Sequence, residues 1–137
     1  MGSNMARYRS SADRPLSPHL QIYRFAITMM MSIAHRITGA ALYAGTFLLA
    51  WWLIAAASSE SYFNNVNALF SSYLGRVILL GYTWALILHM LGGMRHLLWD
   101  TGSGFEKKTL DILGWGTLIG SLAFTIIIWF LAYWLRG

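Results

Sequence analysis

Three long stretches of this sequence carry no charged residue, and they constrain the fold more than any other feature. The stretches are Ile37–Ala57, Val77–Met94 and Ile112–Leu135, which are 21, 18 and 24 residues long. A helix needs roughly 17–25 apolar residues to cross a bilayer, so each stretch is long enough. Apolar residues run continuously through them and do not alternate with polar ones, which excludes the strands of a membrane barrel. The sequence therefore predicts an all-α membrane protein with three transmembrane helices, over about residues 27–57, 66–99 and 109–135.

Composition and cysteine usage exclude several other classes of protein. Charged residues make up 11% of the chain and hydrophobic residues 57%, whereas a soluble domain carries about 25% charged residues. The chain has no cysteine. It therefore cannot itself form a disulfide, a thiolate metal site or the ligand set of an iron–sulfur cluster.

The basic residues predict the orientation of the helices in the membrane. Eight of the ten lie at one end of the predicted bundle, whereas Arg76 and Arg136 lie at the other. Because cytoplasmic loops carry the excess of Lys and Arg, we expect a cytoplasmic N-terminus and a C-terminus outside. This topology signal accounts for the basic N-terminus, so nucleic acid binding is not expected. The eight residues are Arg7, Arg9, Arg14, Arg24, Arg36, Arg95, Lys107 and Lys108.

Residues 1–26 form a polar segment ahead of a transmembrane domain over residues 27–137. Ser17 followed by Pro18 is typical of a helix N-cap with proline in the first helical position, which predicts a short helix on the membrane surface. The segment lacks the apolar core of a secretory signal and has no obvious transit peptide. These features favour a bacterial inner membrane over a mitochondrial one.

The third stretch contains a pattern of small residues at Gly116 and Gly120. Two small residues one turn apart permit two helices to approach closely. Glycine is common in membrane helices, so the sequence leaves open whether this pattern is an interface.

His89 is a titratable ring within the uncharged stretch Val77–Met94. A polar side chain in a bilayer is costly unless it has a partner, so it marks a candidate functional site. An imidazole among hydrophobic helices can be an axial ligand of haem iron. Gly92 and Gly93, one turn further on, border the same helix face and would leave room for a flat macrocycle. The alternative is an imidazole that is merely hydrogen-bonded to a carbonyl or to another helix.

A haem with two axial histidines needs a second ligand, and no other histidine lies as deep in a predicted span. His35 and His96 lie nearer the cytoplasmic boundary, which places them badly for this role. We therefore expect the second ligand to come from another chain. For His96 an interfacial position without a ligand role is favoured, and Asp100 follows it on the same face.

Ser32, His35 and Arg36 share one face of the first predicted helix, together with Gly39. A hydroxyl and a guanidinium one turn apart can both donate hydrogen bonds to a carbonyl oxygen, as a quinone headgroup presents. The alternative is that Arg36 anchors the helix at the membrane surface and that the Ser32 hydroxyl bonds to its own helix. This patch and His89 fall in the same half of the membrane, so a shared site is possible.

Three motifs in this order resemble the cytochrome b556 membrane anchors of succinate dehydrogenase, respiratory complex II. The motifs are Arg14-Pro-Leu-Ser-Pro-His-Leu, Ser32-Ile-Ala-His-Arg-Ile-Thr-Gly39 and His89-Met-Leu-Gly-Gly-Met-Arg-His-Leu-Leu-Trp-Asp100. The resemblance covers the chain from about Arg14 to its end. Each motif alone would be weak, whereas their combination is specific.

The resemblance implies a role for each motif. His89 matches the axial ligand of haem b, and a second three-helix anchor supplies the other histidine. Ser32 and Arg36 match quinone-site residues, and His35 with Arg36 matches positions close to the haem propionates. The motif at Arg14 matches the part that contacts the iron–sulfur subunit. Arg95, His96 and Asp100 also match the family, with less settled roles.

The implied function is that of a non-catalytic subunit in a succinate:ubiquinone oxidoreductase. A flavoprotein with FAD and an iron–sulfur protein would dock on the cytoplasmic face and pass electrons to ubiquinone. Three alternatives remain open at this point. One is the anchor of a quinol:fumarate reductase, which would run the reaction in reverse. The others are a small transporter or channel subunit without redox chemistry, and a purely structural anchor.

Overall fold

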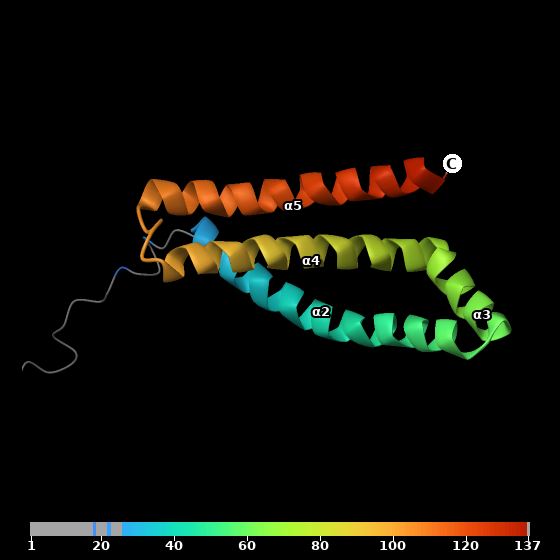
Figure 1. Ribbon diagram of the computed structural model, residues 1–137. Coiled ribbons are helices and arrows are strands. Elements are labelled where there is room, and N and C mark those ends of the chain that lie inside the picture. The colour runs from blue at the N-terminus through green and yellow to red at the C-terminus, as the bar shows by residue number, and fades with distance from the viewer. Residues whose placement is uncertain (1–17, 19–21, 23–25, 137) are drawn as a thin grey trace, which may run out of the picture.

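Four helices account for nearly all of the part of the chain that the structure describes. In this computed structural model the described residues are Pro18, Ile22 and residues 26–136. The helices are α2 (Ile27–Ser58), α3 (Glu60–Ser71), α4 (Tyr73–Asp100) and α5 (Lys107–Arg136). Figure 1 shows α4 lying between α2 and α5, with the short α3 joining α2 to α4 at one end. Helices α2, α4 and α5 are long and apolar enough to cross a membrane, which confirms the all-α architecture with three spans.

The structure differs from the sequence-based helix bounds between the first and second spans. Residues 66–71, expected as the first turns of the second span, belong to the separate helix α3. The break lies at Ser72, whose hydroxyl accepts a hydrogen bond from the Gly75 backbone N–H at 3.1 Å. The Ser72 N–H itself donates to the carbonyls of Ala68 and Leu69 in the last turn of α3. One serine thus ends α3 and caps α4, a local device that hydrophobicity does not reveal.

Two sequence-based expectations are not tested by the described residues. Apart from Pro18 and Ile22, the predicted surface helix in residues 1–26 lies outside them. The cytoplasmic position of the N-terminus also stays a prediction. The ends of the bundle are therefore named here by their helices: the entry end contains the start of α2, and the far end contains α3.

Helix α5 packs against the rest of the molecule through a row of small residues. Gly114, Thr117, Ser121 and Thr125 are its buried residues, spaced three or four positions apart. The Trp84 indole N–H of α4 donates to the Ser121 hydroxyl at 3.1 Å. Small residues allow membrane helices to approach closely, and hydrogen bonds between helices add to the contact.

This row explains the outcome for the predicted Gly116–Gly120 pattern. A Cβ atom added to Gly116 would have nothing within 4 Å, so this glycine faces outward. A Cβ on Gly120 would lie 3.5 Å from the Leu91 side chain, which is ordinary van der Waals contact. The pattern is therefore not the contact surface of α5 within this chain, although Gly120 borders it.

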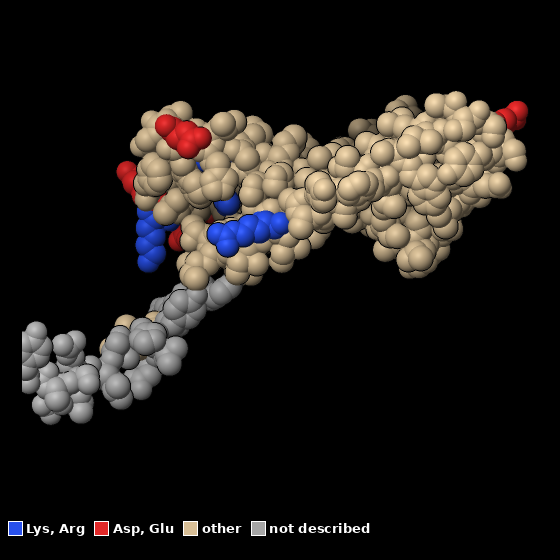
Figure 2. Space-filling model, turned by 90° about the horizontal axis from the view of Figure 1, so that it is seen from below, with Lys and Arg blue, Asp and Glu red and all other residues tan. Residues whose placement is uncertain are grey.

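Most apolar side chains point away from the bundle. Ile37, Phe47 and Ile126 are each more than three-fifths exposed. Figure 2 shows a long uncharged surface, with charged side chains gathered mainly towards one end of the visible face. Such a surface suits lipid tails or the helices of another membrane protein.

Candidate functional site

The site is built where α2 and α4 come closest at the entry end. Gly39 of α2 lies against His89, because a Cβ added to Gly39 would be 3.2 Å from the His89 Cε1. Gly92 of α4 lies against His35, because a Cβ there would be 2.6 Å from the His35 Nδ1. Each glycine thus makes room for the histidine of the opposite helix. The two helices interlock through these reciprocal contacts.

The rings of His35 and His89 stack on each other. Their centroids are 3.9 Å apart and their planes differ by 6°. Two rings stacked face to face cannot place nitrogens on opposite sides of one macrocycle, as a pair of axial ligands must. The geometry therefore agrees with the expectation that His35 is not the second ligand to an iron held by His89.

Contacts on the α2 side favour one tautomer of the His89 ring. The Nδ1 atom lies 3.2 Å from the His35 backbone carbonyl and 3.3 Å from the Thr38 hydroxyl oxygen. The Thr38 hydroxyl donates its own hydrogen to the Ala34 carbonyl at 2.8 Å. A carbonyl oxygen only accepts hydrogen bonds, so this contact favours the tautomer with the proton on Nδ1 and the lone pair on Nε2. A backbone carbonyl that orients a histidine in this way is typical of metal-ligating imidazoles.

The two glycines beside His89 have different roles. The His35 ring occupies the space beside Gly92, so this glycine serves helix packing. It leaves no room for a macrocycle, contrary to the sequence-based expectation. Gly93 has nothing within 4 Å of an added Cβ. An open flank therefore lies on the helix face one turn beyond His89. A single histidine with an available nitrogen and an open flank suits one axial ligand of a haem.

A metal ion bound only by side chains of this chain has less support than a haem. Among the described residues, no group of three or more His, Cys, Asp or Glu side chains could hold one.

A cleft of about 440 Å³ opens beside the histidine pair, and we call it the Arg36 cleft. It brings together Ser32 and Arg36 from α2 with Arg95 and His96 from α4. Ser32 and Arg36 are exposed on this chain, whereas Arg95 is only 5% exposed. The remaining lining residues are Thr28, Met29, Ile33 and Trp99. The sequence predicted Ser32 and Arg36 as a pair, and the structure adds a second guanidinium to them.

Arg95 is a buried cation with unused hydrogen-bond donors. Its Nε and Nη1 have no hydrogen-bond partner among the described residues. Its guanidinium carbon lies 5.0 Å from the centroid of the Trp99 ring, a cation–π contact that offsets part of the cost of burial. Buried donors usually have partners, so these nitrogens mark a place where an acceptor from a ligand or another chain can bind.

Not every residue in the third motif joins the site. His96 lines the Arg36 cleft, and its ring centroid is 5.4 Å from that of His35. Asp100 is the exposed last residue of α4 and does not line the cleft. Thr38 was missed by sequence reasoning, although it follows His35 by three positions and therefore shares its helix face.

A Gly92→Ala variant tests the reciprocal packing of histidines and glycines. We expect the new Cβ to push the His35 ring off His89 and to lower the stability of the purified protein by about 1–3 kcal/mol. Gly81→Ala is the matched control, because it lies on the same helix with nothing within 4 Å of the added Cβ. Thermal unfolding in detergent, followed by circular dichroism, provides the comparison. Equal melting temperatures for the two variants would contradict the packing described here.

Comparison with known proteins places the chain in a family. Residues 10–128 match the family described as succinate dehydrogenase/fumarate reductase transmembrane subunit. The chain is 43% identical over 115 residues to the succinate dehydrogenase cytochrome b556 subunit of Paracoccus denitrificans, covering 84% of this chain and 88% of that protein. It is 38% identical over 116 residues to the same subunit of Rickettsia felis, covering 85% and 90%. The mitochondrial cytochrome b560 subunit of Sus scrofa is 41% identical over 113 residues, covering 79% of this chain and 65% of that protein.

Proposed function

Because the chain belongs to the succinate dehydrogenase/fumarate reductase transmembrane subunit family, we propose that it is the cytochrome b anchor of a succinate:ubiquinone oxidoreductase. In this proposal the chain supplies one axial ligand to haem b and one wall of the quinone site. The observation that carries it is the packing of α2 against α4 at the entry end, where His35 stacks on His89 and the Arg36 cleft opens beside them. The chain does not catalyse succinate oxidation by itself.

His89 is the axial ligand in this proposal. Support comes from the Nδ1–H bond to the His35 carbonyl, which leaves the Nε2 lone pair for iron. The open flank beside Gly93 gives a macrocycle space against α4. When bound, haem b supplies one-electron redox chemistry next to the quinone site. His35 and Arg36 are assigned to the haem propionates because the family resemblance implies it, and the His35 ring stacks on His89.

Ser32 and Arg36 bind a carbonyl oxygen of the quinone headgroup. Reduction adds two electrons and two protons, so negative charge develops on that oxygen before protonation. Guanidinium groups stay charged at any physiological pH, so Arg36 and the adjacent Arg95 act by stabilising this charge and not by giving up protons. Ser32 can donate a hydrogen bond that orients the same oxygen. Trp99 and Ile33 supply the apolar walls for the ring.

The partners in this proposal are those that the family resemblance implies. They are an iron–sulfur subunit, a flavoprotein with FAD, and a second three-helix anchor that provides the other histidine. The absence of cysteine from this chain agrees with an iron–sulfur cluster held by another subunit. Exposed apolar faces on α2 and α5 offer area for that anchor. The complex would lie in a bacterial inner membrane, with the entry end facing the cytoplasm.

Isolation of the complex tests the proposal as a whole. We expect the three partner chains to co-purify, a b-type reduced-minus-oxidised absorption spectrum, and succinate-dependent reduction of ubiquinone. A colourless preparation without quinone dependence would contradict the proposal. It would favour the alternative of a membrane subunit without redox chemistry. The family description also covers fumarate reductase. Faster quinol-dependent fumarate reduction than succinate oxidation would therefore identify the alternative anchor.

A further inference from the structure

A second cavity lies at the far end of the bundle, in the opposite half from the histidine pair. It measures about 430 Å³ and is lined by residues from all four helices, from Gly45 in α2 to Arg136 in α5. Helices α2 and α4 stay close at Gly45, where the Tyr82 ring occupies the space that a Cβ would take. Beyond this point α2 diverges from α4, and α3 bridges the space between them (Figure 1). The cavity occupies this divergence, and we call it the Arg136 cavity.

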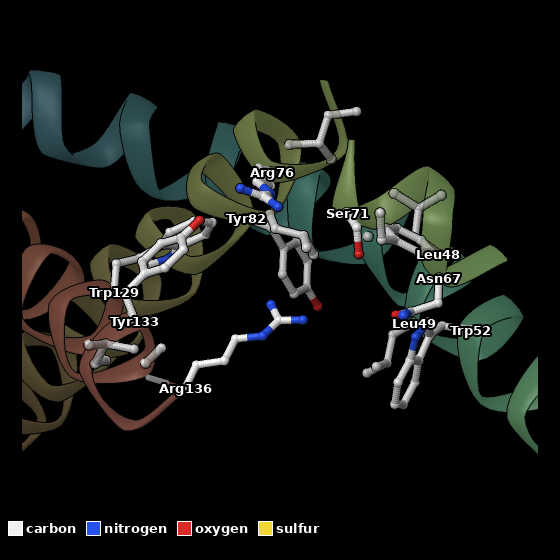
Figure 3. Close-up of a pocket in the computed structure, with 16 residues that line it drawn as sticks. Leu48, Leu49, Trp52, Asn67, Ser71, Arg76, Tyr82, Trp129, Tyr133 and Arg136 are labelled. Atoms are coloured by element: carbon white, nitrogen blue, oxygen red, sulfur yellow. The ribbon is translucent and has the colours of Figure 1, made fainter. Parts of the chain in front are cut away.

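Two arginines far apart in the sequence meet at this cavity. Arg76 comes from the first turn of α4 and Arg136 from the last turn of α5, and both are exposed. Figure 3 shows the Arg136 side chain extending into the cavity, which Arg76 and Tyr82 also line. Among the described residues that line it, none is Asp or Glu. Two positive charges therefore line the cavity, with no Asp or Glu among its described lining residues to balance them.

These two charges lie at the end of the bundle where basic residues are fewer. Among the described basic residues, Arg76 and Arg136 lie at the far end, whereas Arg36, Arg95, Lys107 and Lys108 lie at the entry end. A cation at the C-terminus of α5 also complements the helix dipole, which accounts for one of them. Neither the dipole nor interfacial anchoring explains why both side chains reach the same cavity.

The remaining lining residues divide into polar and apolar groups. Ser71, Asn67 and the Tyr82 hydroxyl line the same cavity as the arginines and offer hydrogen bonds. The apolar wall includes Leu48, Trp52 and Ile128, which lie along the membrane-spanning parts of the helices. A phosphate group with attached acyl chains matches both parts, because guanidinium groups bind phosphate through paired hydrogen bonds and the apolar wall suits hydrocarbon.

We propose that the Arg136 cavity binds the headgroup of an anionic phospholipid, with Arg76 and Arg136 on the phosphate and the first carbons of the acyl chains along the apolar wall. The site is independent of the proposed haem and quinone chemistry, because it uses none of the same residues and lies at the other end of the bundle. Its effect is to fasten the ends of α4 and α5 to the divergent end of α2 through a bound lipid.

The test uses the whole purified complex after detergent has removed its lipids. Phosphatidylglycerol, phosphatidylcholine and inorganic phosphate are added separately, and the melting temperature and the bound phospholipid per complex are measured. We expect phosphatidylglycerol alone to raise the melting temperature and to be retained. An equal effect from phosphatidylcholine would overturn the proposal, since that lipid has no net charge. An equal effect from inorganic phosphate would overturn it too, because the site would then take a free anion.

The matched variants remove two charges from either end of the bundle. Arg76→Gln with Arg136→Gln should weaken retention of phosphatidylglycerol by about 10- to 100-fold, as expected for loss of charge-assisted hydrogen bonds. Lys107→Gln with Lys108→Gln removes the same charge from the entry end and should leave retention unchanged. Arg136→Gln alone changes an exposed residue in the last turn of α5 and keeps the test valid if the double variant does not assemble. Retention that is equal in the arginine and lysine variants would refute the site.

Discussion

Replacement of His89 by alanine is expected to remove the low-spin b-type haem signal from the assembled complex. The physical reason is that His89 is the residue on this chain whose free Nε2 is held in place by a bond from its Nδ1–H to the His35 carbonyl. Changes to residues that only orient a metal ligand already lower affinity by about 10- to 100-fold, so loss of the ligand should have at least that effect. The reduced-minus-oxidised absorption spectrum of the purified complex measures the outcome.

A second histidine on the same helix provides the control. His96 is exposed and lies about two turns from His89, so a His96→Ala variant removes an imidazole without touching the ligand. We expect His96→Ala to keep the low-spin signal and His89→Ala to lose it, with both complexes retaining their partner chains. If His89→Ala kept the signal and His96→Ala lost it, the ligand would be His96 and the stacked pair would serve packing alone.

The long uncharged stretches made the three spans predictable, because each exceeds the length that a bilayer requires. The break at Ser72 was not predictable in the same way. Residues 66–71 are mixed in polarity and would continue a helix, and only the capping of α4 by the Ser72 hydroxyl separates the two elements. Local hydrogen bonding decided this boundary, whereas hydrophobicity decided the spans.

The candidate site was predictable by residue type and only in part by arrangement. Helical spacing placed Ser32, His35 and Arg36 on one face, and the structure keeps them together at the entry end. Spacing within one helix does not predict which helix face packs against a neighbouring helix. The crossing of α2 and α4 determines which faces meet. This crossing depends on the reciprocal contacts of Gly39 and Gly92.

Arg95 illustrates the same limit. Next to His96 at the end of a span it had the sequence context of a residue that reaches the membrane surface. In the structure it is 5% exposed, with two nitrogens that lack hydrogen-bond partners among the described residues. Burial of a charged group at this position depends on the packing of α2 across α4, which no feature of α4 alone encodes.

Replacement of Arg36 by leucine is expected to lower kcat/KM for quinone reduction by about 10- to 100-fold, the range for one lost charge-assisted hydrogen bond. Arg36 is exposed in the isolated chain and lines the cleft together with Ser32, so its loss should affect the ligand more than the fold. Succinate oxidation with a soluble dye as acceptor should stay unchanged, because this reaction takes place in the flavoprotein and bypasses the anchor. The two assays on one preparation separate quinone chemistry from assembly.

Two further variants assign the effect of Arg36 to its chemistry. Arg36→Lys keeps the charge and loses the planar pair of donors, so an intermediate rate indicates that both charge and geometry contribute. Lys108→Gln removes an exposed cation at the same end of the bundle, outside the Arg36 cleft, and should leave quinone reduction unchanged. If Arg36→Leu reduced quinone at the normal rate in an assembled complex, Arg36 would be a surface anchor. The unused donors of Arg95 would then be the remaining candidates for binding the quinone oxygen, since they line the same cleft and have no other described partner.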